Sequence, residues 1–73
     1  MREDILKILE EIRPDVDFES ETSLVDGGVL GSLDIVELVS RLNEEFVIDI
    51  SVDDLVPDNF NTVDAMVELV ESN

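Results

Sequence analysis

Ser32 is the serine whose surroundings best suit chemistry, because it follows Gly31 and directly precedes the strongest amphipathic pattern in the chain. A helix N-terminus presents free N–H groups and the positive end of the helix dipole, and both favour a phosphate. Gly27, Gly28 and Gly31 leave the backbone before Ser32 uncrowded, so that another protein can approach the hydroxyl. The placement therefore suits a hydroxyl that accepts a phosphoryl group. Serine is also a common N-cap residue, and the residues alone favour that role.

The rest of the chemical inventory is thin. The chain has no cysteine and no histidine, which excludes thiolate chemistry and removes the commonest general base and metal ligand. A general acid–base pair would need two carboxylates, and the candidates Glu44–Glu45 and Asp53–Asp54 are merely adjacent in sequence. A chain of 73 residues is too small for a deep cleft that would raise a carboxyl pKa. We therefore expect no catalytic residue and no metal site.

The composition is strongly acidic, with 20 Asp and Glu against four Lys and Arg and a net charge of −16. After residue 13, Arg41 is the only basic residue. Such a field repels nucleic acids and anionic lipids and steers basic partners. No apolar run reaches the ~20 residues of a membrane span, and the charged N-terminus does not resemble a signal peptide. We therefore expect a cytoplasmic monomer that binds no nucleic acid and does not insert into a membrane.

The hydrophobic periodicity predicts helices separated by loops, with no strand that has a partner. With 44% hydrophobic residues the chain can form one small core, and we expect a single domain over 1–73. The predicted fold is all-α, a small antiparallel four-helix bundle with three main helices and a short third helix. In chain order the elements are a helix over 2–13, a loop over 14–31, a helix over 33–46, a short helix opened by Ser51 and closed by Pro57, and a final helix capped by Asn61 or Thr62.

The helix predicted over 33–46 has more apolar positions than one narrow core face needs. Leu33 and Val36 form a small apolar strip that Glu37 and Glu44 rim. The strip is either the margin of a wide core face or a surface on which a partner docks, and the helical wheel by itself favours the wide core face. The core face comprises Ile35, Leu38, Val39, Leu42 and Phe46.

The segment over 31–46, Gly-Ser-Leu-Asp-Ile-Val-Glu-Leu-Val-Ser-Arg-Leu-Asn-Glu-Glu-Phe, resembles the start of the second helix of acyl carrier proteins. That family has the pattern Asp-Ser-Leu-Asp, followed by alternating apolar and acidic positions and an ending near Glu-Glu-Phe. The rest of the chain is similar as well, with a long loop that carries Leu24 and Gly27-Gly28 and a final helix that opens at Phe-Asn-Thr-Val. The resemblance covers nearly all 73 residues and implies the same helical bundle.

The resemblance implies that Ser32 carries 4′-phosphopantetheine through a phosphodiester, placed there by a phosphopantetheinyl transferase that uses coenzyme A. The terminal thiol of this arm would hold an acyl or aminoacyl group as a thioester, which accounts for a carrier without cysteine. Short acyl chains would be sheltered between the helices, and basic partner enzymes would dock on the helix that Ser32 begins. The partner-binding positions implied by the match are Leu33, Asp34, Val36, Glu37, Glu44, Asp53 and Asp54.

Departures from the family pattern bear on partners and cargo. Gly31 stands where the family usually has Asp, which removes one carboxylate beside the arm and makes recognition by some transferases less efficient. Ser40 and Arg41 replace apolar and uncharged surface, and they indicate a different set of partners. The stretch from Val47 to Phe60 is longer than in the fatty-acid carriers. It is more similar to stand-alone carriers of the D-alanyl type, which an amino-acid-activating ligase loads.

The sequence leaves the cargo open between fatty acyl groups for fatty-acid or related biosynthesis, other acyl groups and aminoacyl groups. The corresponding partners are an acyl- or aminoacyl-activating ligase and downstream transferases or synthases with basic docking patches. A function of another class is an unmodified acidic protein-binding module, which needs the carboxylates but not Ser32. The intact mass after incubation with a transferase, magnesium and coenzyme A separates these alternatives.

Overall fold

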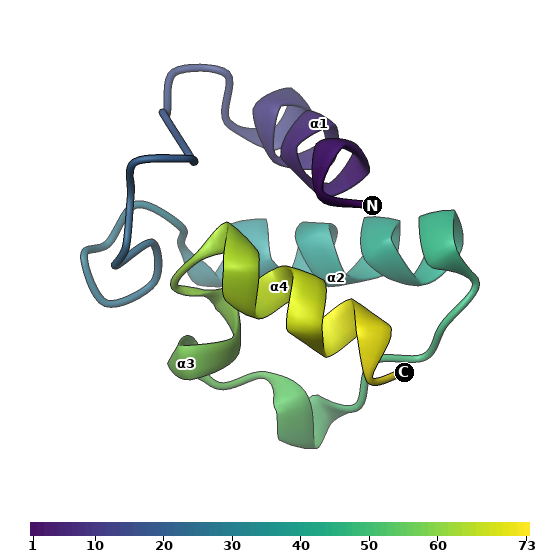
Figure 1. The fold of residues 1–73 in the computed structure, drawn as a ribbon. Helices are drawn as coiled ribbons and strands as arrows, with labels where there is room; N and C mark the ends of the chain where they lie inside the picture. The colour runs from purple at the N-terminus through teal and green to yellow at the C-terminus, as the bar shows by residue number, and fades with distance from the viewer.

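The computed structural model describes residues 1–73 and contains no strand. The all-α class is confirmed, and the three long helices lie where the periodicity predicts them. None of the helices combines the length and the apolar run that crossing a membrane requires. Figure 1 shows the elements in chain order, which are α1 (Arg2–Ile12), α2 (Ser32–Phe46), the 3-10 turn η1 (Val52–Asp54), α3 (Pro57–Phe60) and α4 (Val63–Glu71).

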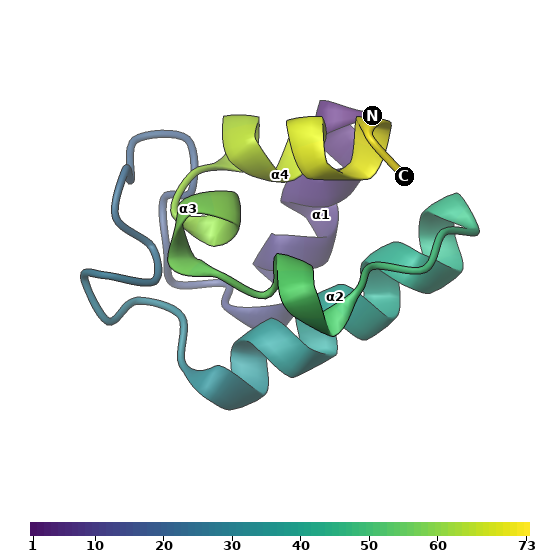
Figure 2. The same ribbon diagram turned by 90° about the horizontal axis from the view of Figure 1, so that it is seen from below.

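Helix α1 packs against both α2 and α4, and α3 packs against α4. α1 runs against the direction of α2, whereas α4 runs in the same direction as α2 (Figures 1 and 2). Helix α1 is thus antiparallel to α2 and α4, whereas α2 and α4 are parallel to each other. The connection after α2 crosses back to the end where α2 begins, and so the residues before α4 lie beside the loop before α2. A backbone hydrogen bond from Leu24 N–H to the Asn61 carbonyl, 3.0 Å long, joins these two segments.

The region between α2 and α4 consists of two short segments rather than the single short helix predicted. Ser51 opens η1 as expected, because its Oγ accepts the Asp53 N–H at 3.2 Å. Pro57 does not close this turn, which already ends at Asp54; it is instead the first residue of α3. Proline is favourable there because the first turn needs no donor from it and its fixed φ suits a helix.

The ends of α2 and α4 are defined by local hydrogen bonding. Thr62, and not Asn61, caps α4, since its Oγ1 accepts the Ala65 N–H at 3.0 Å. At the C-terminal end of α2, Val47 adopts a left-handed conformation with φ of 53° and is 89% exposed. A β-branched residue rarely takes this conformation, which here turns the chain out of α2 and back across the molecule.

The core contains 14 buried residues, and all of them are hydrophobic. Leu38 and Leu42 supply the fully buried part of α2, whereas the other residues of its predicted core face are partly buried. Phe18 is buried although it lies in the loop between α1 and α2, where no helical periodicity marks it as a core residue. The buried residues are Ile5, Ile8, Leu9, Phe18, Leu24, Leu30, Leu38, Leu42, Ile50, Phe60, Val63, Met66, Leu69 and Val70.

The long loop is attached to the core by Leu24 and Leu30, which are both buried as predicted. Two glycines make the turn between them. The Gly27 N–H donates to the Ser23 carbonyl, and a Cβ on Gly27 would lie only 2.6 Å from that oxygen. Gly28 has a φ of +76°, which side chains disfavour. This turn therefore requires both glycines and brings the chain to the start of α2.

The net charge leads to a prediction for stability. Arg2, Arg13 and Arg41 form ion pairs with exposed or partly exposed carboxylates, which leaves most of the 20 acids without a cation. We expect the melting temperature to rise between ~0.02 and ~0.5 M NaCl, because screening weakens the repulsion among these acids. Exposed ion pairs contribute only about 0–1 kcal/mol each, so that their weakening matters less. Thermal melts followed by circular dichroism measure the effect, and a melting temperature that falls with salt would show that the ion pairs dominate.

Candidate functional site

Ser32 is the first residue of α2, and its side chain is exposed. The N-cap is Gly31, with extended φ and ψ of −87° and 177°, so the predicted capping role of Ser32 is wrong. The helix start is instead closed by Asp34, whose Oδ2 accepts the Gly31 N–H at 3.0 Å. The first helical bond of this end runs from Ile35 N–H to the Gly31 carbonyl. The N–H groups of the first turn are therefore free, and the Ser32 hydroxyl is available beside them.

Arg13 ties three parts of the chain together next to this helix start. Its Nη1 donates to the Val29 carbonyl at 2.8 Å and lies 3.5 Å from Asp34 Oδ2, while its Nε lies 3.4 Å from Asp15 Oδ1. The hydrogen bond and charge of Asp15, with a smaller effect of Asp34, raise the pKa of Arg13, and the Arg13 guanidinium lowers the pKa of Asp15. The end of α1, the loop and the first turn of α2 are thus held by one guanidinium.

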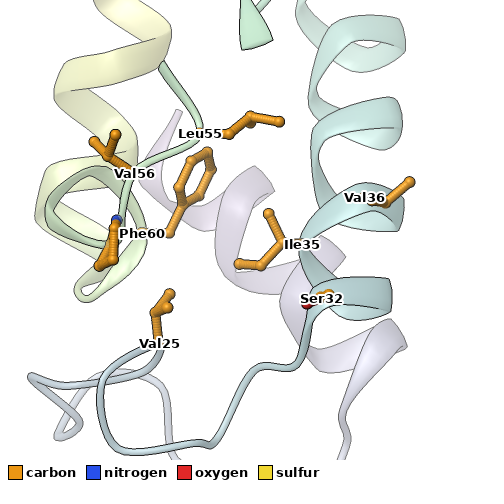
Figure 3. A pocket seen from close by; sticks show the side chains of 8 residues that line it. Val25, Ser32, Ile35, Val36, Leu55, Val56 and Phe60 are labelled. Atoms are coloured by element: carbon orange, nitrogen blue, oxygen red, sulfur yellow. The ribbon is translucent and has the colours of Figure 1, made fainter. Parts of the chain in front are cut away.

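An open groove of about 300 Å³ lies beside Ser32, between the first turns of α2 and the segment from η1 to α3. Figure 3 shows Ile35, Leu55 and Phe60 facing one another across it, with Ser32 and Val25 at one end. Six of its eight lining residues are hydrophobic. An exposed hydroxyl thus stands at the end of an apolar wall. The lining residues are Val25, Ser32, Ile35, Val36, Leu55, Val56, Pro57 and Phe60.

The apolar strip on α2 is a surface and not part of the core. Leu33 is 85% exposed and Val36 61%, so the wide core face that the helical wheel favours is wrong for these two residues. Glu37 and Glu44 are exposed beside them. Neighbouring large apolar side chains that are exposed are typical of an interaction surface. Arg41 Nη1 lies 2.6 Å from Glu11 Oε1 of α1, so its positive charge is paired within the molecule.

The remaining predicted partner residues have different surroundings. Asp34 is half-buried and holds the Gly31 N–H, so its carboxylate belongs to the helix start as much as to the surface. Asp53 and Asp54 lie in η1 and not in the short helix α3. Next to them Val52 is 81% exposed, a surface residue that the sequence analysis did not identify.

Sequence reasoning also missed that Val25, Leu55 and Phe60 come together at one groove. These residues come from the long loop, the stretch after η1 and α3, and no periodicity links them. The only local signal is the concentration of apolar residues around Pro57, which indicates burial but not its location.

Comparisons with known proteins identify the family of the chain. Residues 2–70 match the family described as "Phosphopantetheine attachment site". This match covers most of the chain, which therefore belongs to the phosphopantetheine carrier family. The cofactor of such a carrier is covalently attached 4′-phosphopantetheine, and an exposed serine hydroxyl beside free helix N–H groups fits a phosphodiester.

Two curated relatives are similar to the chain over most of its length. The chain is 33% identical, over 69 residues, to the D-alanyl carrier protein of Streptococcus mutans serotype c and to that of Streptococcus sanguinis. Each match covers 93% of this chain and 87% of the relative. No solved structure matches the chain.

Proposed function

We propose that Ser32 is the residue to which 4′-phosphopantetheine is attached. The observation that carries the proposal is the position of this hydroxyl, which is exposed, not used as a cap and located at the free N–H groups of α2. These groups and the helix dipole stabilise the charge of a phosphodiester there. When bound, the arm supplies a terminal thiol that holds the cargo as a thioester.

The chain provides the nucleophile but no base for the attachment. Ser32 Oγ forms the new bond to the phosphorus that carries the pantetheine arm of coenzyme A. The pyrophosphate bond breaks at the same phosphorus, adenosine 3′,5′-bisphosphate leaves, and a base must accept the hydroxyl proton. Histidine is missing from the chain, and the nearest helix-start carboxylate, Asp34, is engaged by the Gly31 N–H and Arg13. A phosphopantetheinyl transferase must therefore supply the proton acceptor and bring coenzyme A as the donor of the arm. We accordingly propose that the protein is a non-catalytic carrier and that it acts in the cytoplasm, where coenzyme A and its transferase meet.

For the cargo, we propose an aminoacyl group of the D-alanyl kind, loaded by an activating ligase. The names of the two relatives support this, since both are D-alanyl carrier proteins and match over nearly the whole chain. The packing supports it as well, because the core is closely packed and the apolar hollow beside Ser32 is an open groove. A cargo of a few atoms needs no interior cavity, whereas a long fatty chain would have to separate the packed core residues.

The experiment for the cargo begins with protein converted by a broad transferase, magnesium and coenzyme A. The product is then incubated with ATP and either D-alanine and a D-alanine-activating ligase or a fatty acid and an acyl-activating ligase. We expect an intact-mass increase for D-alanine that hydroxylamine removes, as for a thioester. Loading by the fatty acid alone would contradict the aminoacyl proposal and favour a fatty-acyl carrier.

We further propose that partner enzymes dock on the apolar strip of Leu33 and Val36, with Glu37 and Glu44 at its rim. Asp53 and Asp54 in η1 extend this acidic surface. The support is the exposure of the strip, given above, and the scarcity of basic residues after residue 13. A complementary basic patch on the partner would be steered to it.

Charge reversal tests the docking surface. Glu37→Lys or Glu44→Lys should slow association with the transferase several-fold at low salt, and the difference should shrink near ~0.15 M salt, where screening acts over ~8 Å. Stopped-flow association rates at two ionic strengths measure this effect. Glu68→Lys is the matched control for Glu44→Lys, because both glutamates are exposed and form no ion pair, whereas Glu37 lies 3.8 Å from Arg41 Nε. Equal slowing by all three variants would show that only the net charge matters.

A further inference from the structure

Asn61 uses its polar groups to join the loop before α2 to the junction of α3 and α4. Its Oδ1 accepts the N–H groups of Val25, at 2.9 Å, and Asp26, at 3.0 Å. Its Nδ2 donates to Asp26 Oδ2 at 2.9 Å, and its carbonyl accepts the Leu24 N–H at 3.0 Å. The Asn61 N–H meanwhile donates to the Pro57 carbonyl within α3. Four hydrogen bonds thus connect one residue to three consecutive loop residues about 35 positions away.

The Asn61 contacts are not needed to cap a helix, because Thr62 caps α4. They instead provide hydrogen-bond partners for backbone N–H groups of the loop, which has no helix or strand to satisfy them. The bond between Val25 N–H and Asn61 Oδ1 is partly buried, so water replaces it less easily than the two exposed bonds to Asp26.

The same loop segment leads directly to Ser32. The Leu24 carbonyl accepts the Leu30 N–H at 2.8 Å, and both of these side chains are buried. Leu30 is followed at once by Gly31 and Ser32. Two consecutive backbone hydrogen bonds, Asn61 to Leu24 and Leu24 to Leu30, therefore link the α3–α4 junction to the start of α2.

The groove beside Ser32 depends on the same contacts. Val25 and Phe60, the residue before Asn61, both line the groove on the side that faces Ile35 of α2 (Figure 3). The bond between Val25 N–H and Asn61 Oδ1 therefore joins the two segments that form the side of the groove opposite α2.

We propose that Asn61 is a positioning residue for the attachment of the arm: it holds Leu24–Asp26 against the α3–α4 junction and thereby keeps Ser32 and the groove in the arrangement that the transferase binds. This inference rests on the proposed function of Ser32. Without these bonds the loop opens locally, and only the fraction of molecules with a closed loop is competent to bind. The apparent affinity falls by that fraction, while the step that follows binding is unchanged.

The test compares Asn61→Ala with Asn43→Ala. Asn43 is a matched control because its Oδ1 accepts one backbone N–H, that of Ile50 at 2.9 Å, near the opposite end of α2. For Asn61→Ala we expect KM for the carrier in arm transfer to rise about fivefold with kcat nearly unchanged. A fivefold rise means that the loop is open in about four of five molecules, so amide exchange at Val25 and Asp26 should approach the rate of unprotected amides. Asn43→Ala should leave both KM and the exchange of these two amides at the wild-type values. A wild-type KM for folded Asn61→Ala would overturn the proposal.

An exchange of the two side chains provides the rescue. Asn61→Asp alone places two carboxylates together and should raise KM at least as much as Asn61→Ala. Combining it with Asp26→Asn restores an amide donor and a carboxylate acceptor in reversed positions, with the net charge of the wild type, and should return KM towards the wild-type value. A double variant no better than Asn61→Asp would contradict a positioning role. Modification of Ser32→Ala would overturn the attachment site itself, whereas an unmodified Ser32→Ala together with a wild-type KM for Asn61→Ala would overturn only the role of Asn61.

Discussion

The Ser32→Ala protein is expected to fold like the wild type and to accept no phosphopantetheine. The loss of modification should be complete, because the hydroxyl oxygen is the atom that bonds to phosphorus. The structure also lowers the expected cost in stability. Gly31 is the N-cap and Ser32 caps nothing, so the loss of ~0.5–2 kcal/mol usual for a removed serine cap does not apply. Because alanine is the better helix former by a few tenths of a kcal/mol, the melting temperature should be unchanged or slightly higher.

The measurement is the intact mass after incubation with transferase, magnesium and coenzyme A, combined with a thermal melt. Ser40→Ala is the matched control, because Ser40 is an exposed serine of the same helix and lies away from its N-terminal turn. It should still be modified to completion, because the Ser32 hydroxyl remains. A phosphopantetheine adduct on folded Ser32→Ala would show that another residue carries the arm.

Truncating Leu42 is expected to remove much of the stability of the protein, whereas truncating Leu33 is not. Leu42 is fully buried in the core, and a buried Leu→Ala change costs about 2–5 kcal/mol through lost burial and the cavity it leaves. A domain of this size has a total stability of only roughly 4–11 kcal/mol. Leu33 is 85% exposed, so Leu33→Ala should change the free energy of unfolding by less than about 0.5 kcal/mol.

Leu33→Ala should instead weaken docking and raise KM for the transferase. Urea denaturation gives the two free energies of unfolding, and steady-state arm transfer gives the two values of KM. Leu42→Ala is best assayed at a temperature where circular dichroism shows it folded, and there its KM should approach the wild-type value. Comparable destabilisation by both variants would place Leu33 in the core and remove the apolar strip as a docking surface.

The long helices were predictable because their signal is local. Ile5, Leu9, Leu38 and Leu42 recur at helical spacing, and the structure buries all four. Periodicity also separates Leu33 and Val36 from the centre of the core face, although the wheel wrongly favoured a covered flank. Whether it is covered depends on the position of other helices, and α1 and α4 leave both residues exposed.

Errors arose where competing local solutions are nearly equal in energy. Ser32 and Gly31 are both acceptable N-caps, and the Asp34 carboxylate decided the outcome by accepting the Gly31 N–H. Asn61 and Thr62 are equally plausible caps by type. Thr62 took that role and left Asn61 to bind the loop.

The sequence by itself determined the acidic, all-helical character of the carrier, the helix that Ser32 begins and the resemblance that the family match confirmed. Only the tertiary structure decided what surrounds Ser32: the groove between α2 and the segment from η1 to α3, the guanidinium of Arg13 and the loop attached to Asn61. The physical reason is the range of the interactions. Helical periodicity and charge act between residues a few positions apart or as a sum over the chain. The groove instead depends on the path that the chain takes after α2. All the buried contacts together determine this path, so no single segment of the sequence carries a pattern that predicts it.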